Sequence, residues 1–253
     1  KRGNMLFFFF LLSCFFSRLN SHLFFIDIFG QLSFHIVIGG ILLFFILLIL
    51  KRLLASVICI LICILLSMDI LLSCNRCDAF LKDKSQNYNK IRLMTFNVSY
   101  DNKVKNFENI LELILFEKPD VIQFQEVSPQ MQYKLKSLQV FFPYTSELNK
   151  PIDHFDSIIL SKYPLISSRV KKNHAIIASL VVDNSEITVI GIHLDNQINQ
   201  TGFKFAIKQM NYLKALVGNT NQNLVLMGDL NMTSVSKRFT NFLKETNLYT
   251  YTS

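Results

Sequence analysis

The run LVLMGDLN, residues 224–231, shows how the soluble part of this chain is organised. Its first four residues are apolar, which is typical of a buried strand, and the polar residues that follow end the strand. These polar residues include Asp229, directly after Gly228, and Asn231. The run therefore predicts a buried strand that carries a carboxylate and an amide at its end.

Three further apolar runs have the same design. They are LMTFN, VIQFQE and ITVIGIH, and they end at Asn97, Glu126 and His193. If the four strands are neighbours in sheets, their last side chains converge on one edge, as a hydrolytic site requires. The shared placement of these polar residues therefore predicts one functional site.

Each of these residues also has a structural interpretation when it is taken singly. Asn97 and Asn231 are common turn formers, and Asp229 is suited to start a turn. A lone histidine such as His193 is more often a hydrogen-bonded structural residue than a catalyst. Glu126 is the hardest to explain in this way, because a carboxylate next to the apolar VIQF run is costly to bury without a partner or an ion.

Helical periodicity between the strands predicts an α/β architecture. Apolar residues recur at helical spacing through NFENILELILFEK, and residues 119–120, Pro-Asp, end this helix before the strand VIQFQEV. A strand, helix and strand in this order favour an α/β fold. The turn at residues 183–186 predicts an antiparallel hairpin between IIASLVV and ITVIGIHL. The other expected elements are the strand SIILSK and helices near 131–138, over 203–217 ending at Gly218, and after Ser234 or Ser236.

Charge divides the chain into two parts. Residues 1–77 hold six Lys/Arg and two Asp/Glu, whereas residues 78–253 hold twenty and sixteen, so each part contributes four to the net charge of +8. This small excess does not predict a nucleic-acid groove, in which basic residues are usually clustered. One basic cluster, Arg169 with Lys171 and Lys172, is expected in a solvated turn.

All five cysteines lie within residues 1–77, which excludes a thiol nucleophile and a cysteine-bound zinc from the soluble part. Cys74 and Cys77 form a C-x-x-C motif, which is compatible with a disulfide, a metal pair or a lipid attachment point. No second pair accompanies this motif. Two small residues at the exit from a membrane are the simplest interpretation.

Three apolar runs precede the soluble part. Residues 53–72 are long enough to cross about 30 Å of hydrocarbon as a helix. Residues 34–50 give a second run, and Lys51-Arg52 joins the two in a tight helical hairpin. Residues 5–16 form a third run, which is either a short span or an interfacial segment. A cleaved signal peptide accounts for this run alone.

The positive-inside rule gives the expected orientation. Lys1-Arg2 and Lys51-Arg52 are expected on the cytoplasmic side, so the soluble part emerges on the other side whether or not the first run spans. In a bacterium this means the inner membrane, with the soluble domain in the periplasm. We therefore expect a membrane anchor over residues 1–77 with two or three transmembrane helices, a polar linker over 78–90 and a domain over 91–253.

Five stretches of the soluble part resemble the endonuclease/exonuclease/phosphatase superfamily, which has the deoxyribonuclease I-like fold. They are LMTFNVSY, VIQFQEV, SIILSKYPL, GIHLDN and LVLMGDLNMT, and they follow the family's order. A membrane-tethered bacterial branch of this family carries several spans before the domain. The resemblance implies a four-layer α/β sandwich of two packed mixed sheets flanked by helices, here incomplete at the C-terminus and preceded by transmembrane helices.

The resemblance also implies a role for each residue at the strand ends. Glu126 would be the principal ligand of Mg²⁺ or Mn²⁺, with Asn97 near the metal or the phosphate, since a hard cation prefers oxygen ligands. His193 would hydrogen-bond the scissile phosphate. Asp229 would orient the attacking water, and Asn231 would hold a phosphate oxygen. The implied reaction is in-line attack of water on a phosphoester.

The chain departs from the family pattern at three places. Ile192 stands where the family usually has Thr, and Asp156 where many members have Gly. The third departure is the lack of the family's C-terminal Ser-Asp-His motif. It does not appear in the 22 residues after Asn231, and no histidine follows His193. Removal of a general base typically costs about 10²- to 10⁴-fold in rate. The 253-residue chain is therefore expected to be weakly active or inactive, with a sheet edge left uncovered.

Two functions are compatible with the sequence. The first is a membrane-anchored, metal-dependent phosphodiester hydrolase, and the second is a non-catalytic membrane protein with a remnant phosphoesterase-like domain. A transporter is disfavoured, because Asp69 is expected near the interface without a paired intramembrane charge. Relatives cut nucleic acid, phospholipid headgroups, inositol phosphates and sphingomyelin. The anchor favours a membrane-proximal or lipid substrate among these.

Overall fold

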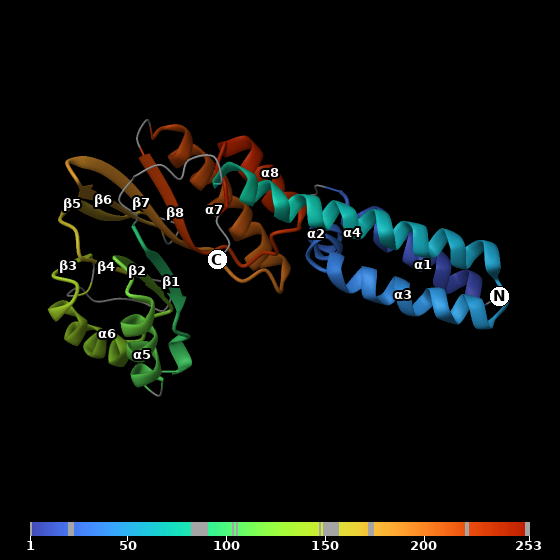
Figure 1. Ribbon diagram of the computed structural model, residues 1–253, viewed down its shortest axis with the longest axis horizontal. Helices are drawn as coiled ribbons and strands as arrows, with labels where there is room; N and C mark the ends of the chain where they lie inside the picture. Colours follow the sequence, from blue (N-terminus) through green and yellow to red (C-terminus); the bar gives the residue numbers. More distant parts are fainter. Residues whose placement is uncertain are drawn as a thin grey trace. The chain divides into compact units, whose positions relative to one another are not determined.

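A computed structural model describes residues 2–19, 23–81, 91–102, 104, 106–146, 148, 157–171, 175–220 and 223–250 (Figure 1). The chain divides into two compact units. We call residues 88–196 with 208–231 the sandwich unit, and residues 1–87 with 197–207 and 232–253 the helical unit.

The sandwich unit is built on two mixed sheets. In sheet A the strand order is β1-β2-β4-β3, with β1 and β2 parallel and the other pairs antiparallel. In sheet B the order is β5-β6-β7-β8, and the β7–β8 pair is parallel. The strands are β1 (Leu93–Asn97), β2 (Val121–Gln125), β3 (Tyr144–Ser146), β4 (Ser157–Ser161), β5 (Leu165–Lys171), β6 (Ala175–Val182), β7 (Ser185–His193) and β8 (Asn223–Asp229).

A two-residue turn joins β6 to β7. Asp183 and Asn184 both have left-handed backbones, with φ of 48° and 63°. This is the pattern of a type I′ turn, whose twist matches that of the flanking strands. The predicted antiparallel hairpin is confirmed, and Ser185 and Glu186 belong to β7 rather than to the turn.

Helices flank both sheets, as the sequence predicted. Helix α5 (Phe107–Glu117) ends at the left-handed Lys118, directly before Pro119. Helix α6 (Pro129–Leu135) continues into the 3₁₀ turn η2 (Lys136–Val140), and η1 (Tyr100–Asn102) follows β1. The helix α7 (Gln200–Gly218) contributes its residues 208–218 to this unit. The expected α/β fold of two mixed sheets with flanking helices is confirmed.

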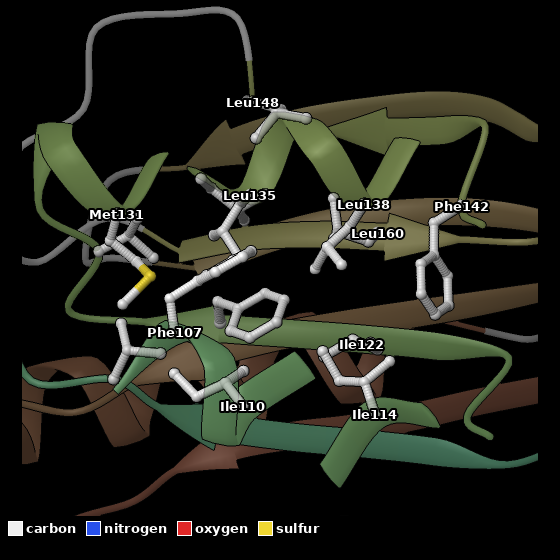
Figure 2. Close-up of a cluster of buried hydrophobic side chains, with 14 residues drawn as sticks. Phe107, Ile110, Ile114, Ile122, Met131, Leu135, Leu138, Phe142, Leu148 and Leu160 are labelled. Atoms are coloured by element: carbon white, nitrogen blue, oxygen red, sulfur yellow. The ribbon is translucent and has the colours of Figure 1, made fainter. Parts of the chain in front are cut away.

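Strand β2 lies between two hydrophobic cores, and all five of its residues are buried. Ile122 and Phe124 pack in a cluster with side chains of α5, α6 and η2, several of which Figure 2 labels. Val121 packs in a second cluster with residues of β4, β6 and β7. Because successive side chains of a strand point to opposite faces, β2 supports the helical layer on one side and sheet B on the other.

The helical unit contains the apolar N-terminal segments. Helices α3 and α4 form the predicted hairpin, in which Lys51 takes a left-handed backbone with φ of 53°. Arg52 Nη1 donates to Asn4 Oδ1 at 3.1 Å, so the start of α1 lies beside this turn. The helices are α1 (Arg2–Ser17), α2 (Phe24–Gln31), α3 (Ser33–Ile49), α4 (Leu53–Leu81) and α8 (Lys237–Thr246).

One helical segment of the described residues, Leu53–Leu72 of α4, is long and apolar enough by itself to cross a membrane. Helices α2 and α3 meet at a bend of 70° and give a second candidate when they are taken together. The helix of the first apolar run, α1, is apolar but shorter. Large hydrophobic side chains on α4, such as Leu54 and Leu65, are 77% and 66% exposed.

Charged side chains gather at the end of these helices away from Arg52. Asp69 forms ion pairs with Arg18 and, at 3.5 Å, with Lys237. The expectation that Asp69 has no paired charge was therefore wrong. Sequence reasoning missed the pairing because Arg18 is 51 residues away along the chain.

Four elements were not predicted, namely α2, η1, β3 and β5. Helix α8 begins after Ser236, whose side chain accepts a hydrogen bond from Phe239 N at 3.3 Å. This agrees with the second of the two predicted starts, after Ser234 or after Ser236. Helix α4 continues to Leu81, into the segment predicted as a linker. Arg169 and Lys171 of the basic cluster lie in β5 rather than in the predicted turn. Outside the described residues or side chains lie the rest of that linker (82–90), Asp156, Lys172, Cys74 and Cys77.

Candidate active site

The strand ends of the sandwich unit carry the five residues that the sequence singled out. Asn97 is the last residue of β1, His193 the last of β7 and Asp229 the last of β8. Glu126 directly follows β2. In the ladders, β1 pairs with β2 up to Asn97, and His193 is the partner of Asp229. The strands therefore present these side chains at one edge, as predicted.

Side-chain contacts connect the five residues across the two sheets. Asn97 Nδ2 donates to Glu126 Oε1 at 2.8 Å and lies 3.5 Å from Asp229 Oδ2. His193 Nε2 lies 3.4 Å from Glu126 Oε1 and 3.5 Å from Asn231 Nδ2. The structure thus brings together all of the predicted site residues, from β1 and β2 of sheet A and from β7 and β8 of sheet B.

Two of the five residues have strained backbones. Glu126 has φ of 53° and Asn231 has φ of 47°, both in the left-handed region. Asparagine adopts this region more readily than most residues, whereas glutamate does so rarely. Strain of this kind costs about 1–3 kcal/mol and is concentrated at functional sites. The left-handed backbone at Glu126 turns the chain at the point where its carboxylate meets Asn97 and His193.

Three hydrogen bonds, one backbone–backbone and two between a side chain and the backbone, fix the end of β8. Asp229 Oδ1 accepts from Asn231 N at 2.8 Å, and Asp229 O accepts from Leu194 N at 2.9 Å. Asn231 Nδ2 in turn donates to Leu194 O at 2.7 Å. These bonds join the turn after β8 to the segment after β7, so Asp229, Asn231 and His193 are held in one local framework.

The site is asymmetric in its exposure and its charge. The His193 side chain is 5% exposed, whereas the Glu126 carboxylate side chain is 30% exposed. The carboxylates of Glu126 and Asp229 both contact Asn97 Nδ2. Asn97 Oδ1 accepts a hydrogen bond from Ser99 N at 2.9 Å. Negative charge therefore gathers at the solvent-facing side of the site, above a buried imidazole.

The carboxylate and amide groups of this site suit a divalent cation that prefers oxygen ligands. Among the described residues no three His, Cys, Asp or Glu side chains form a metal-binding group by themselves. Mg²⁺ does not need such a group, because it is usually held by one or two carboxylates and keeps several waters. The Asn97 amide between Glu126 and Asp229 occupies the place where a positive charge is favoured, so these residues are the ones that could hold a cation.

Sequence reasoning missed two buried glutamines that contact the site's framework. Gln123 lies within β2 and Gln209 within α7, and both are fully buried. The available signal for Gln123 was a polar residue in the middle of the apolar run VIQF, which is unusual in a buried strand. Gln209 gave no comparable signal, because a glutamine in an amphipathic helix normally faces water.

Comparisons with known proteins match the chain to one family model and to several solved structures. The sequence profile described as "Endonuclease/Exonuclease/phosphatase family" matches residues 94–252. Among solved structures, a β-hairpin deletion mutant of beta toxin from Staphylococcus aureus is similar over 63% of this chain and 74% of its own, with 17% identity and a TM-score of 0.50. No curated protein sequence matches the chain.

Two further structures are similar. A double mutant of the same beta toxin, with bound magnesium ions, matches over 64% of this chain and 72% of its own, with 17% identity and a TM-score of 0.53. The structure of SmcL matches over 63% and 70%, with 15% identity and a TM-score of 0.52. At these identities the likeness establishes the fold.

Proposed function

The chain belongs to the Endonuclease/Exonuclease/phosphatase family, and from this premise we propose that it is a membrane-anchored hydrolase that cleaves a phosphodiester with Mg²⁺ or Mn²⁺. One observation carries the proposal: Asn97 Nδ2 contacts the carboxylates of both Glu126 and Asp229, at 2.8 and 3.5 Å, beside His193. The similar beta toxin structure with bound magnesium ions supports the choice of cation.

Glu126 would hold the cation through its carboxylate oxygens. Asn97 would join it through Oδ1 once its amide turned over, because in this structure Nδ2 faces Glu126 and Oδ1 accepts from Ser99 N. When it is bound, the cation supplies Lewis-acid stabilisation of the charge that develops on the phosphoryl oxygens. Glu126 has a left-handed backbone, and its Oε1 already lies 2.8 Å from Asn97 Nδ2. A preformed position of this kind reduces the reorganisation required during the reaction.

The other three residues would act on the substrate and on water. His193 hydrogen-bonds a phosphate oxygen from its nearly buried position, and Asn231 binds a second oxygen beside it. Asp229 orients the attacking water, and its own carboxylate is held by the bond from Asn231 N at 2.8 Å. The water attacks phosphorus in line with the leaving oxygen, so that a phosphomonoester forms as the bond to that oxygen breaks. The attacking water gives up a proton to solvent, and the leaving oxygen takes one from solvent and departs as the alcohol.

The apolar helices support the proposed anchor. The segment Leu53–Leu72 meets the length and composition of a span, and α3 precedes it in a hairpin. We propose that the Lys51-Arg52 turn lies in the cytoplasm and that the sandwich unit lies on the other side of a bacterial inner membrane. Tethering near the bilayer raises the local concentration of lipid headgroups, so a phospholipid is the favoured substrate over nucleic acid.

The test uses the full chain in lipid nanodiscs. A chromogenic bis-aryl phosphodiester is assayed with Mg²⁺, with Mn²⁺ and with EDTA, for the wild type, Glu126→Ala and Glu112→Ala. Glu112 is an exposed carboxylate on α5 and provides the matched control. We expect cation-dependent turnover that Glu126→Ala abolishes and Glu112→Ala preserves. Turnover that persists in Glu126→Ala would overturn the site, and no turnover with either cation favours the non-catalytic alternative.

Substrate class is decided with the same protein. Vesicles of sphingomyelin or of phosphatidylcholine are compared with single-stranded DNA as substrates, and released headgroup phosphate or shortened DNA is measured. Faster release from one of the lipids supports the lipid assignment. Faster cleavage of DNA contradicts it while leaving the hydrolase assignment intact.

A further inference from the structure

Gln123 is a buried polar side chain that links the two sheets. It lies in the middle of β2, is fully buried, and packs over Gly191 of β7, where an added Cβ would come within 2.9 Å of Gln123 Nε2. The Gln123 side-chain amide has two possible orientations, and in one of them both its nitrogen and its oxygen form hydrogen bonds. In that orientation the nitrogen donates to Met227 O at 2.8 Å and the oxygen accepts from Ile192 N at 3.1 Å.

These bonds fall where β7 and β8 approach each other most closely at a glycine. Gly228 is the ladder partner of Ile192 and has φ of +133°. A Cβ at Gly228 would lie 1.8 Å from Ile192 O, so the two backbones approach more closely than any other residue allows. The next residues along the strands are His193 and Asp229. Gln123 therefore holds both strands directly before their site residues.

Gln209 holds the same strand end from helix α7. Its side chain is fully buried, and its Nε2 donates to His193 O at 3.3 Å. Its Oε1 accepts from Asp195 N at 2.8 Å. The backbone on both sides of His193 thus receives side-chain hydrogen bonds, from Gln123 before it and from Gln209 at and after it.

A purely structural explanation of both glutamines is incomplete. Burial of an amide is costly unless it is hydrogen-bonded, and apolar side chains of similar size would fill the same core volume. The hydrogen bonds of both amides go to the backbone of one short stretch, residues 192–195, and to the neighbouring strand β8. The shared target is the backbone that carries His193.

We infer that Gln123 and Gln209 are positioning residues for the hydrolytic site. They hold the ends of β7 and β8 so that His193 faces Glu126 and Asn231, and so that Asp229 stays beside Asn97. This inference rests on the proposed function for its effect on catalysis. Its structural part, the hydrogen bonding at Ile192 and Asp195, does not depend on activity.

The kinetic test compares Gln123→Met and Gln209→Met with Val189→Ala in nanodiscs. Methionine keeps the side-chain length and removes the amide, whereas Val189 is a fully buried residue of the same strand whose side chain is apolar. Small displacements of site residues cost about 10- to 100-fold in rate. We expect this loss in kcat, with little change in KM, for both methionine variants. Val189→Ala is expected to lower Tm and to keep the wild-type kcat.

Amide hydrogen exchange provides the readout that does not need turnover. We expect exchange at Ile192 N–H to become about tenfold faster in Gln123→Met, and exchange at Asp195 N–H to do so in Gln209→Met, relative to Val189→Ala. Each variant is examined separately, so one that fails to fold leaves the other as a test. Wild-type kcat in both methionine variants, or exchange no faster than in Val189→Ala, overturns the inference. An inactive wild type with the expected exchange rejects the hydrolase and retains the positioning contacts.

Discussion

Arg238 of α8 and Asp27 of α2 form a buried ion pair, with Arg238 Nη2 2.9 Å from Asp27 Oδ2 and each side chain 8% exposed. The residues lie 211 positions apart in the sequence. The Arg238 guanidinium also stacks 4.9 Å from the ring centre of Phe203 and donates to Gln197. Within the helical unit this pair joins the N-terminal segments to the C-terminal helix.

Removal of one partner of this pair is expected to be strongly destabilising. Arg238→Met leaves the Asp27 carboxylate buried without its counter-charge, which costs about 3–5 kcal/mol. The double variant Asp27→Leu with Arg238→Met removes both charges and is expected to recover most of that loss. Thermal unfolding in detergent micelles measures both values. Equal destabilisation by the single and double variants would contradict a pairing role.

The left-handed backbone of Glu126 predicts a gain in stability when the residue is replaced by glycine. Glu126→Gly relieves a strain of about 1–2 kcal/mol and removes one of two neighbouring carboxylates. We expect higher Tm together with loss of phosphodiester turnover. Lys118→Gly is the matched control, because Lys118 has a similar φ of 50° outside the site. It should raise Tm and leave turnover unchanged. A lower Tm in Glu126→Gly alone would show that its backbone is not strained.

Gly228 is expected to tolerate no side chain. Gly228→Ala places a Cβ 1.8 Å from Ile192 O at a φ of +133°, so β8 has to move or unfold. A loss of about 3 kcal/mol or more is expected in urea or thermal unfolding. Gly218→Ala is the control, since no atom lies within 4 Å of a Cβ at Gly218. Helix propensity predicts a gain of about 0.5–1 kcal/mol for that change. Equal effects at the two glycines would contradict the close approach at Gly228.

Membrane orientation is open to a direct measurement. A protease added to right-side-out vesicles is expected to digest the sandwich unit, whereas the same protease added to inside-out vesicles is expected to leave it intact. The physical reason is that Lys51 and Arg52 resist transfer across the bilayer and keep their turn in the cytoplasm. Immunoblotting of the intact and digested chain gives the result. Digestion only in inside-out vesicles would reverse the proposed orientation.

The positions of the site residues were predictable because each follows a strong apolar run. Asn97, Glu126, His193 and Asp229 mark the points where buried strands end, and such ends are visible in the sequence. The sequence also predicted the turn between β6 and β7 through its Asp183-Asn184 pair. These features depend on local chemistry, which one stretch of sequence contains.

The remaining features depend on contacts between distant segments. The short strand β3 spans three residues and helix α2 spans eight, which is too little for a clear periodicity. The ion-pair partners of Asp27 and Asp69 come from segments far along the chain, so no local sequence pattern predicts them. The bonds of Gln123 to Ile192 and Met227 likewise require that sheet A be packed on sheet B.

The connection between α3 and α4 has a consequence for biogenesis. It consists of Leu50, Lys51 and Arg52, and the start of α1 is bonded to the same place through Asn4 and Arg52. In the proposed anchored state neither helix can enter the bilayer far ahead of the other. The two helices are therefore expected to insert together, as one hairpin.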